Sequence, residues 1–98
     1  MKERCGVVPE VVLCDPKLTG AAVRVYALLA MHAGEKSWCW PSLRRLSEQL
    51  HVSRRSVLRA TKKLEEAGFI TRERHDGRLI YVLKREVFNG SDNTAPLN

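Results

Sequence analysis

Apolar side chains recur at helical spacing from residue 21 onward and predict a long first helix. Val25 and Leu29 lie on one side of it when residues are placed about 100° apart. The hydroxyl of Thr19 can cap its first turn, and Gly34 can end it as a left-handed cap. His32 falls in the last turn, where we expect an ordinary packed helix residue rather than a ligand or a catalyst.

Two further amphipathic helices follow, separated by a short turn. Ser42 can cap the second helix, whose leucines recur at i, i+3 and i+7 on one face. His51 and Val52 form the turn, Ser53 can cap the third helix, and Gly68 follows its end. The apolar side of the third helix consists of Val57, Ala60, Thr61, Leu64 and Ala67.

Beyond Gly68 the period changes from helical to extended. Residues 69–75 and 78–84 are two strand candidates. Between them lie Asp76 and Gly77, a pair typical of a two-residue β-hairpin turn. The whole pattern predicts an α+β fold, with a three-helix core followed by a hairpin.

The two ends of the chain carry weaker signals. The valine-rich residues 7–13 are interrupted by Pro9, which favours a short edge strand or an extended arm. Residues 89–98, NGSDNTAPLN, are polar and rich in turn formers, as in a flexible tail or a linker. We therefore expect an arm at residues 1–17, a folded domain at 18–88 and a tail at 89–98.

A loop is expected at residues 35–41, where Trp38 and Trp40 flank Cys39. Exposed aromatic side chains can serve as stacking platforms for the bases of single strands. More often such residues cover the edge of a small core, and we expect at least one of the two tryptophans to do so.

The formal net charge of +6 is concentrated in one part of the chain. Residues 41–85 carry 12 Lys or Arg and 5 Asp or Glu, whereas the remainder carries 5 basic and 6 acidic residues. A basic excess confined to one segment favours a polyanionic partner, of which nucleic acid is the commonest. Taken alone, the basic excess is explained equally well by a need for solubility as by a polyanionic partner.

The third helix arranges part of this charge as a stripe. The side opposite Val57 holds Arg55, Arg59 and Lys62, with Ser56 and Lys63 at one edge and Arg54 nearer the apolar side. A solvated face usually mixes charges at i, i+4 spacing, as in Lys62 and Glu66, but Arg55 and Arg59 have no acidic neighbour on the stripe. Arginine can bond guanine through two hydrogen bonds, and lysine suits phosphate. The stripe therefore favours a helix that reads DNA over a merely solvated face.

Two helices joined by a turn of three or four residues form a helix-turn-helix, whose second helix can enter the major groove. Candidates for contacts between the second predicted helix and the DNA backbone are Ser42, Arg44 and Arg45.

The hairpin tip, RERHDGRL, adds a second basic element. A basic hairpin beside a recognition helix can lie along the DNA backbone or enter the minor groove. Arg74 and Arg78 bracket the tip and are the first candidates, with Arg72 a weaker one. Charge on a hairpin also simply protects a sheet edge, so the position directly after the third helix is what gives this signal its weight.

The stretch CWPSLRRLSEQLHVSRRSVLRATKKLEEAGFITRERHDGRLIYVL resembles the winged helix-turn-helix domains of bacterial, plasmid and phage DNA-binding proteins. It is most similar to the group with a CWPS…L…S.RSV…L…GFI pattern, found in replication initiators and transcription regulators. The likeness covers residues 18–83. The resemblance implies a recognition helix that uses Ser53, Arg54, Arg55, Ser56 and Arg59, and a wing that uses Arg74, His75 and Arg78.

One residue departs from the common helix-turn-helix pattern. The position after the second helix is often glycine, which takes positive φ easily, but here it is His51. Histidine tolerates that region better than branched residues do. The turn is therefore expected either to carry slight strain or to be less tight than the glycine version.

Other classes of protein have little support. The sequence shows no phosphate-cradling glycine loop, no paired metal ligands and no nucleophile with a base, so we expect neither an enzyme nor a cofactor, metal or small-molecule ligand. Of three cysteines without close pairs, Cys39 is expected to be buried and Cys5 exposed. No apolar run is long enough to span a membrane, and a soluble cytoplasmic protein is expected.

The sequence predicts binding to double-stranded DNA, as a transcription regulator or as the DNA-binding domain of a plasmid or phage replication initiator. A homodimer on a two-fold site is an open expectation. A protein-interaction module is the alternative, in which Trp38, Trp40 and Leu58 would make the contacts.

Overall fold

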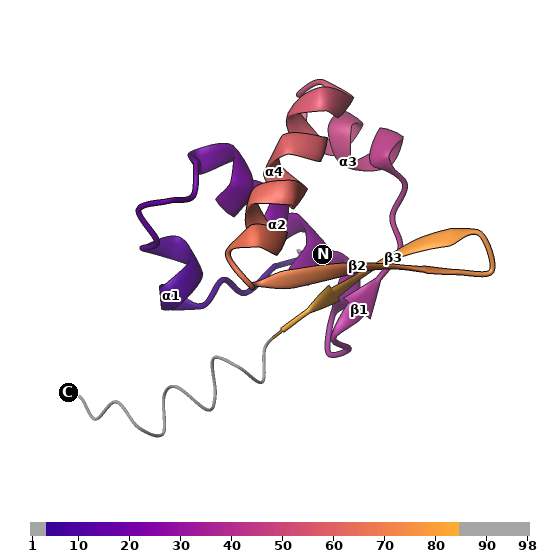
Figure 1. The fold of residues 1–98 in the computed structure, drawn as a ribbon, viewed down its shortest axis with the longest axis horizontal. Helices are drawn as coiled ribbons and strands as arrows, with labels where there is room; N and C mark the ends of the chain where they lie inside the picture. Colours follow the sequence, from indigo (N-terminus) through magenta and orange to yellow (C-terminus); the bar gives the residue numbers. More distant parts are fainter. Residues whose placement is uncertain (1–3, 85–98) are drawn as a thin grey trace.

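The computed structural model describes residues 4–84, in which a helical layer packs along one side of a small antiparallel sheet (Figure 1). In chain order the elements are α1 (Glu10–Leu13), α2 (Gly20–Ala33), β1 (Trp38–Cys39), α3 (Leu43–Leu50), α4 (Arg54–Glu66), β2 (Ile70–His75) and β3 (Arg78–Leu83). The α+β class, the three longer helices and the hairpin are confirmed.

Hydroxyl caps begin each of the three longer helices at the residues that the sequence indicates. Thr19 accepts a hydrogen bond from the backbone N–H of Ala22 at 3.1 Å. Ser42 and Ser53 cap α3 and α4 in the same way, each at 3.0 Å. Such a cap typically stabilises a helix by about 1 kcal/mol, which explains why these boundaries are readable from the sequence.

The core lies where α2, α3 and α4 meet the inner face of the sheet. Its members come from every one of these elements, so the three helices and the hairpin share one hydrophobic core. The largest fully buried side chains include Tyr26, Leu29, Leu46, Leu64, Ile70, Tyr81 and Leu83.

The hairpin has the predicted turn. Asp76 and Gly77 have φ values of 53° and 76°, the left-handed pair that a two-residue turn of this kind requires. The register pairs Ile70 with Leu83 and His75 with Arg78, so the basic tip projects beyond the helices (Figure 1).

Residues 35–41 were predicted to be a loop, but the structure places strand β1 within them. Trp38 pairs with Val82 and Cys39 with Tyr81, which makes β1 the third strand of a sheet ordered β1-β3-β2. Alternation along this strand places Cys39 inside, with 4 % of its surface exposed. Both tryptophans therefore lie outside, and the prediction that at least one would cover the core is wrong.

The prediction for residues 7–13 is also wrong, since residues 10–13 form the short helix α1. Pro9 precedes its first turn with φ −62°, and the Pro9 carbonyl accepts the backbone N–H groups of Val12 and Leu13 at 3.0 Å each. Proline is well suited to a helix start because its φ is already helical. Val12 is fully buried in the core, so the N-terminal segment packs against the domain.

The predicted tail at residues 89–98 and the end of the predicted domain at residue 88 lie outside the described residues.

The N-terminal segment passes so close to α2 that position 6 requires glycine. A Cβ on Gly6 would run into the carbonyl group of Ala27. We expect Gly6→Ala to lower the free energy of unfolding by about 1–3 kcal/mol, measured by urea unfolding with circular dichroism. Gly20→Ala is the control, since a Cβ there meets nothing within 4 Å and alanine favours a helix. Equal losses in the two variants would contradict the close approach.

Candidate nucleic-acid interface

Helices α3 and α4 form a helix-turn-helix whose turn is held by backbone hydrogen bonds. The N–H groups of His51 and Val52 both reach the carbonyl of Ser47, the latter at 3.1 Å. His51 has φ 58° and ψ 43°, in the left-handed region. Of the two expectations for this residue, the strained turn is therefore the one observed. The guanidinium of Arg24 donates to the Leu50 carbonyl at 3.3 Å and adds a partner for the end of α3.

The conformation of His51 leads to a stability prediction. Glycine adopts this conformation without steric cost, so we expect His51→Gly to raise the free energy of unfolding by up to about 1 kcal/mol. His51→Val should lower it, because a β-branched residue is a strong outlier at positive φ. Thermal unfolding of both variants measures the difference. A valine variant as stable as the glycine variant would show that the left-handed geometry does not limit stability here.

Helix α4 separates an apolar side from a basic side as the helical wheel predicts. Val57, Ala60, Thr61 and Leu64 are buried. The exposed basic side chains of this helix form what we call the α4 basic face, which consists of Arg54, Arg55, Arg59, Lys62 and Lys63. Within residues 4–84 no acidic side chain forms an ion pair with any of them. The expected pair between Lys62 and Glu66 is thus not formed.

The serines predicted for the recognition helix shape its first turn. The Ser53 hydroxyl accepts the backbone N–H of Ser56 and donates to the Ser56 hydroxyl, both at 3.0 Å. Ser53 is exposed and Ser56 half-buried. The exposed cap leaves the start of α4 open to an anion, for which helix N-termini are favourable.

The wing tip carries three of the predicted basic residues, all exposed. Arg74 donates to the carbonyl of Gly77 at 3.5 Å across the turn, and His75 contacts Glu73 at 3.0 Å. The Arg78 guanidinium lies 5.3 Å from the ring centre of Trp40. The tip is therefore held by contacts within itself and by one cation–π contact at its base.

Arg72, the weaker candidate, does not belong to this tip. Its Nε and Nη2 both donate to one carboxylate oxygen of Glu65, at 3.0 and 2.8 Å, and its backbone N–H donates to the other at 3.4 Å. The pair is half-buried and ties β2 to α4, so we assign Arg72 a structural role. Arg72 also faces Tyr81, whose pKa is raised by burial and lowered to a smaller extent by the arginine charge.

The start of α3 carries the three residues predicted to contact the DNA backbone. The Ser42 hydroxyl caps the helix, and Arg44 forms an exposed i, i+4 ion pair with Glu48 at 3.0 Å. Exposed pairs of this kind contribute well under about 1 kcal/mol, so Arg44 can exchange Glu48 for a phosphate. Arg45 is exposed and borders a cleft beside the tryptophans.

One feature of this surface is the alternative that we did not favour, and another was not predicted. Trp38 and Trp40 are 39 % and 45 % exposed and stack on each other at the base of the wing. Glu65, the partner of Arg72, was missed because the pairing crosses from a helix to a strand. Period-2 alternation around Cys39 was the one available signal for the tryptophans.

Other kinds of site are not formed by the described part of the chain. Residues 4–84 bring together no three His, Cys, Asp or Glu side chains that could hold a metal ion. None of the helices in this range has the length and apolar character needed to cross a membrane.

A family model described as a helix-turn-helix domain matches residues 17–70, more than half of the chain. The chain belongs to this helix-turn-helix family. The matched segment runs from just before α2 to the first residue of β2, so it contains the two-helix motif and the helix packed behind it. Membership in this family supports DNA binding.

The fold also has a counterpart among solved structures. The structure described as "Structure of MDR initiator" is similar to this chain with a TM-score of 0.63 and 19% sequence identity. The match covers 95% of this chain and 91% of the other. At this identity the likeness shows the fold, a winged helix-turn-helix. No curated protein matches this chain.

Proposed function

We propose that this helix-turn-helix domain binds double-stranded DNA sequence-specifically, with α4 in the major groove and the wing against the neighbouring backbone or minor groove. The α4 basic face carries the proposal, since its charges are exposed and form no ion pairs within residues 4–84. A surface that only needs solubility usually pairs such charges with acidic neighbours.

Each group of residues has a distinct role in the proposal. Arg55 and Arg59 face the base edges, where arginine can bond guanine through two hydrogen bonds. Lys62 and Lys63 meet phosphates as point charges. The remaining backbone contacts come from Ser42, Arg44 and Arg45 at the start of α3 and from Arg74, His75 and Arg78 in the wing. No catalytic step is part of this role.

Two biological roles fit such a domain, a transcription regulator and the DNA-binding part of a plasmid or phage replication initiator. The similarity to the structure called an MDR initiator supports the second. Selection of bound duplexes from a random pool tests specificity and discriminates between the roles. A tandem array of sites would favour an initiator, a single palindrome would favour a homodimeric regulator, and no consensus would contradict sequence-specific reading.

The alternative function is a protein-interaction module, for which the exposed Leu58 and the two exposed tryptophans are the motivating observation. Titration of a labelled duplex at two salt concentrations decides between the two functions. Duplex binding should weaken steeply as salt rises, because each neutralised phosphate releases counterions. The absence of duplex binding at low salt would favour the interaction module.

A further inference from the structure

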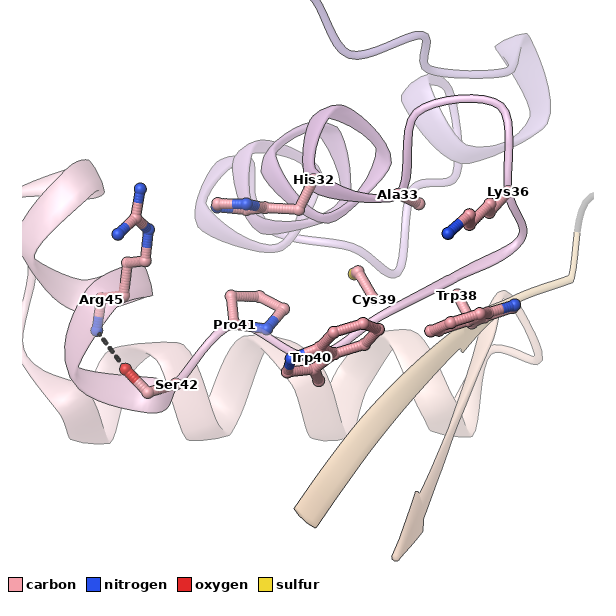
Figure 2. Close-up of a pocket in the computed structure, with 9 residues that line it drawn as sticks. All are labelled: His32, Ala33, Lys36, Trp38, Cys39, Trp40, Pro41, Ser42 and Arg45. Atoms are coloured by element: carbon pink, nitrogen blue, oxygen red, sulfur yellow. Dashed lines mark hydrogen bonds between the residues drawn. The ribbon is translucent and has the colours of Figure 1, made fainter. Parts of the chain in front are cut away.

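A cleft of about 430 Å³ lies between the end of α2, strand β1 and the start of α3. Figure 2 shows Trp38 and Trp40 along one side of it and His32, Ala33 and Lys36 along the other, with Arg45 at one end. We call this the tryptophan cleft. The side chains that border it are basic, aromatic or small, and none of the described lining residues is acidic.

The aromatic side of the cleft is a continuous stack. The Trp38 and Trp40 rings have centres 5.0 Å apart and planes within 18° of parallel. The Lys36 amine lies 5.0 Å from the centre of the Trp38 ring, and the Arg78 guanidinium lies 5.3 Å from that of Trp40. Two large aromatic side chains that remain more than a third exposed next to several cations have the chemistry of a nucleotide site, with a face for a base and charges for its phosphate.

The cleft is continuous with the surface proposed for duplex DNA. Ser42 and Arg45 border the cleft and also belong to the proposed backbone contacts of α3. Arg78 belongs to the wing and contacts the stack from the other side. A strand that separates from the duplex next to the wing would therefore lie close to the tryptophans.

We propose that the tryptophan cleft binds unpaired nucleotides of a single DNA strand, with bases stacked on Trp38 and Trp40 and phosphates against Lys36 and Arg45. Its place beside the duplex rests on the proposed function, whereas the binding itself rests on the cleft alone. An exposed cation–π contact is weaker than the stacking of a base on an aromatic ring. A base can therefore displace Lys36 or Arg78 from a ring face, and the released cation remains within reach of the phosphate.

The chain is well suited to a direct test, because its only two tryptophans are both in the cleft. Titration of the whole chain with an oligothymidylate of about eight nucleotides should quench the tryptophan fluorescence. The affinity for the oligothymidylate should fall as the salt concentration rises. Unchanged fluorescence at low salt would overturn the proposal. Free thymidine monophosphate is the second arm, and quenching by it as strong as by the oligomer would show a nucleotide pocket instead of a strand site.

Variants measured by anisotropy of a labelled oligothymidylate locate the contact. Trp38→Ala should weaken binding about tenfold, whereas Trp38→Phe, which retains an aromatic face, should lose much less. Lys36→Glu changes a loop charge outside the paired strands and should weaken binding without unfolding the chain. Wild-type affinity in both Trp38→Ala and Lys36→Glu would exclude the cleft.

The same oligomer separates this proposal from the proposed duplex binding. The double variant Arg55→Ala, Arg59→Ala should bind oligothymidylate like the wild type, since neither residue borders the cleft. Loss of duplex binding with quenching retained in the double variant would support both proposals, whereas a wild-type chain that quenches with oligothymidylate but binds no duplex would overturn the proposed function and leave the cleft proposal standing. If the double variant loses both activities equally, the single strand binds on α4 and the cleft proposal falls.

Discussion

Replacing Arg55 or Arg59 by alanine should weaken binding to the preferred duplex by about 1–3 kcal/mol each and relax the choice of base at the contacted position. Both side chains are exposed on the solvent face of α4, opposite the buried Val57. Because no acidic residue within residues 4–84 pairs with them, their removal breaks no internal ion pair. Fluorescence anisotropy with the selected duplex measures the loss.

Two controls make this result specific. Lys84→Ala removes one exposed positive charge just beyond β3, at the end of the hairpin far from the tip, and should change the affinity little. Arg74→Ala in the wing should weaken preferred and unrelated duplexes similarly, as expected for a contact to the backbone. If Arg55→Ala and Arg59→Ala bind like the wild type, α4 does not read the groove.

The parts of the fold that were predictable are those with local signals. Thr19, Ser42 and Ser53 each cap a helix within three residues, and Asp76 with Gly77 closes the hairpin within its own turn. Such interactions form between residues close in sequence, so they can be predicted without knowing how the rest of the chain folds.

The parts that were not predictable depend on distant partners. Strand β1 exists because Trp38 and Cys39 pair with Val82 and Tyr81, more than forty residues later. A two-residue strand has no periodicity of its own, and neither does the four-residue helix α1. The outward position of both tryptophans follows from that pairing. Alternation around Cys39 agrees with it, but the tryptophan cleft also needs the positions of α2 and α3, which spacing does not give.

The candidate site likewise has a part that follows from local sequence and a part that depends on distant partners. The α4 basic face follows from helical geometry alone, because one wheel places the arginines opposite the apolar side. The assignment of Arg72 needed the position of β2 against α4, which brings its guanidinium to Glu65. Sequence spacing cannot distinguish such a structural arginine from one left exposed, whereas the partners in the fold can.

Leu64→Ala should lower the free energy of unfolding by about 2–5 kcal/mol, the largest stability effect that we expect in this domain. Leu64 has no exposed surface, and its helix packs against α2, α3 and β2 at once. A domain of this size is stable by only about 5–15 kcal/mol, so the loss would leave a substantial unfolded fraction under mild denaturant. Urea unfolding followed by circular dichroism measures it.

Leu58→Ala provides the matched control, since it makes the same substitution in the same helix at a side chain that is 45 % exposed. Helix propensity changes equally in the two variants, and only burial differs between them. Leu58→Ala should therefore change stability by no more than about 0.5 kcal/mol. Similar losses in both variants would mean that α4 is held by helix propensity rather than by its buried side. The α4 basic face would then lack the fixed orientation that groove reading requires.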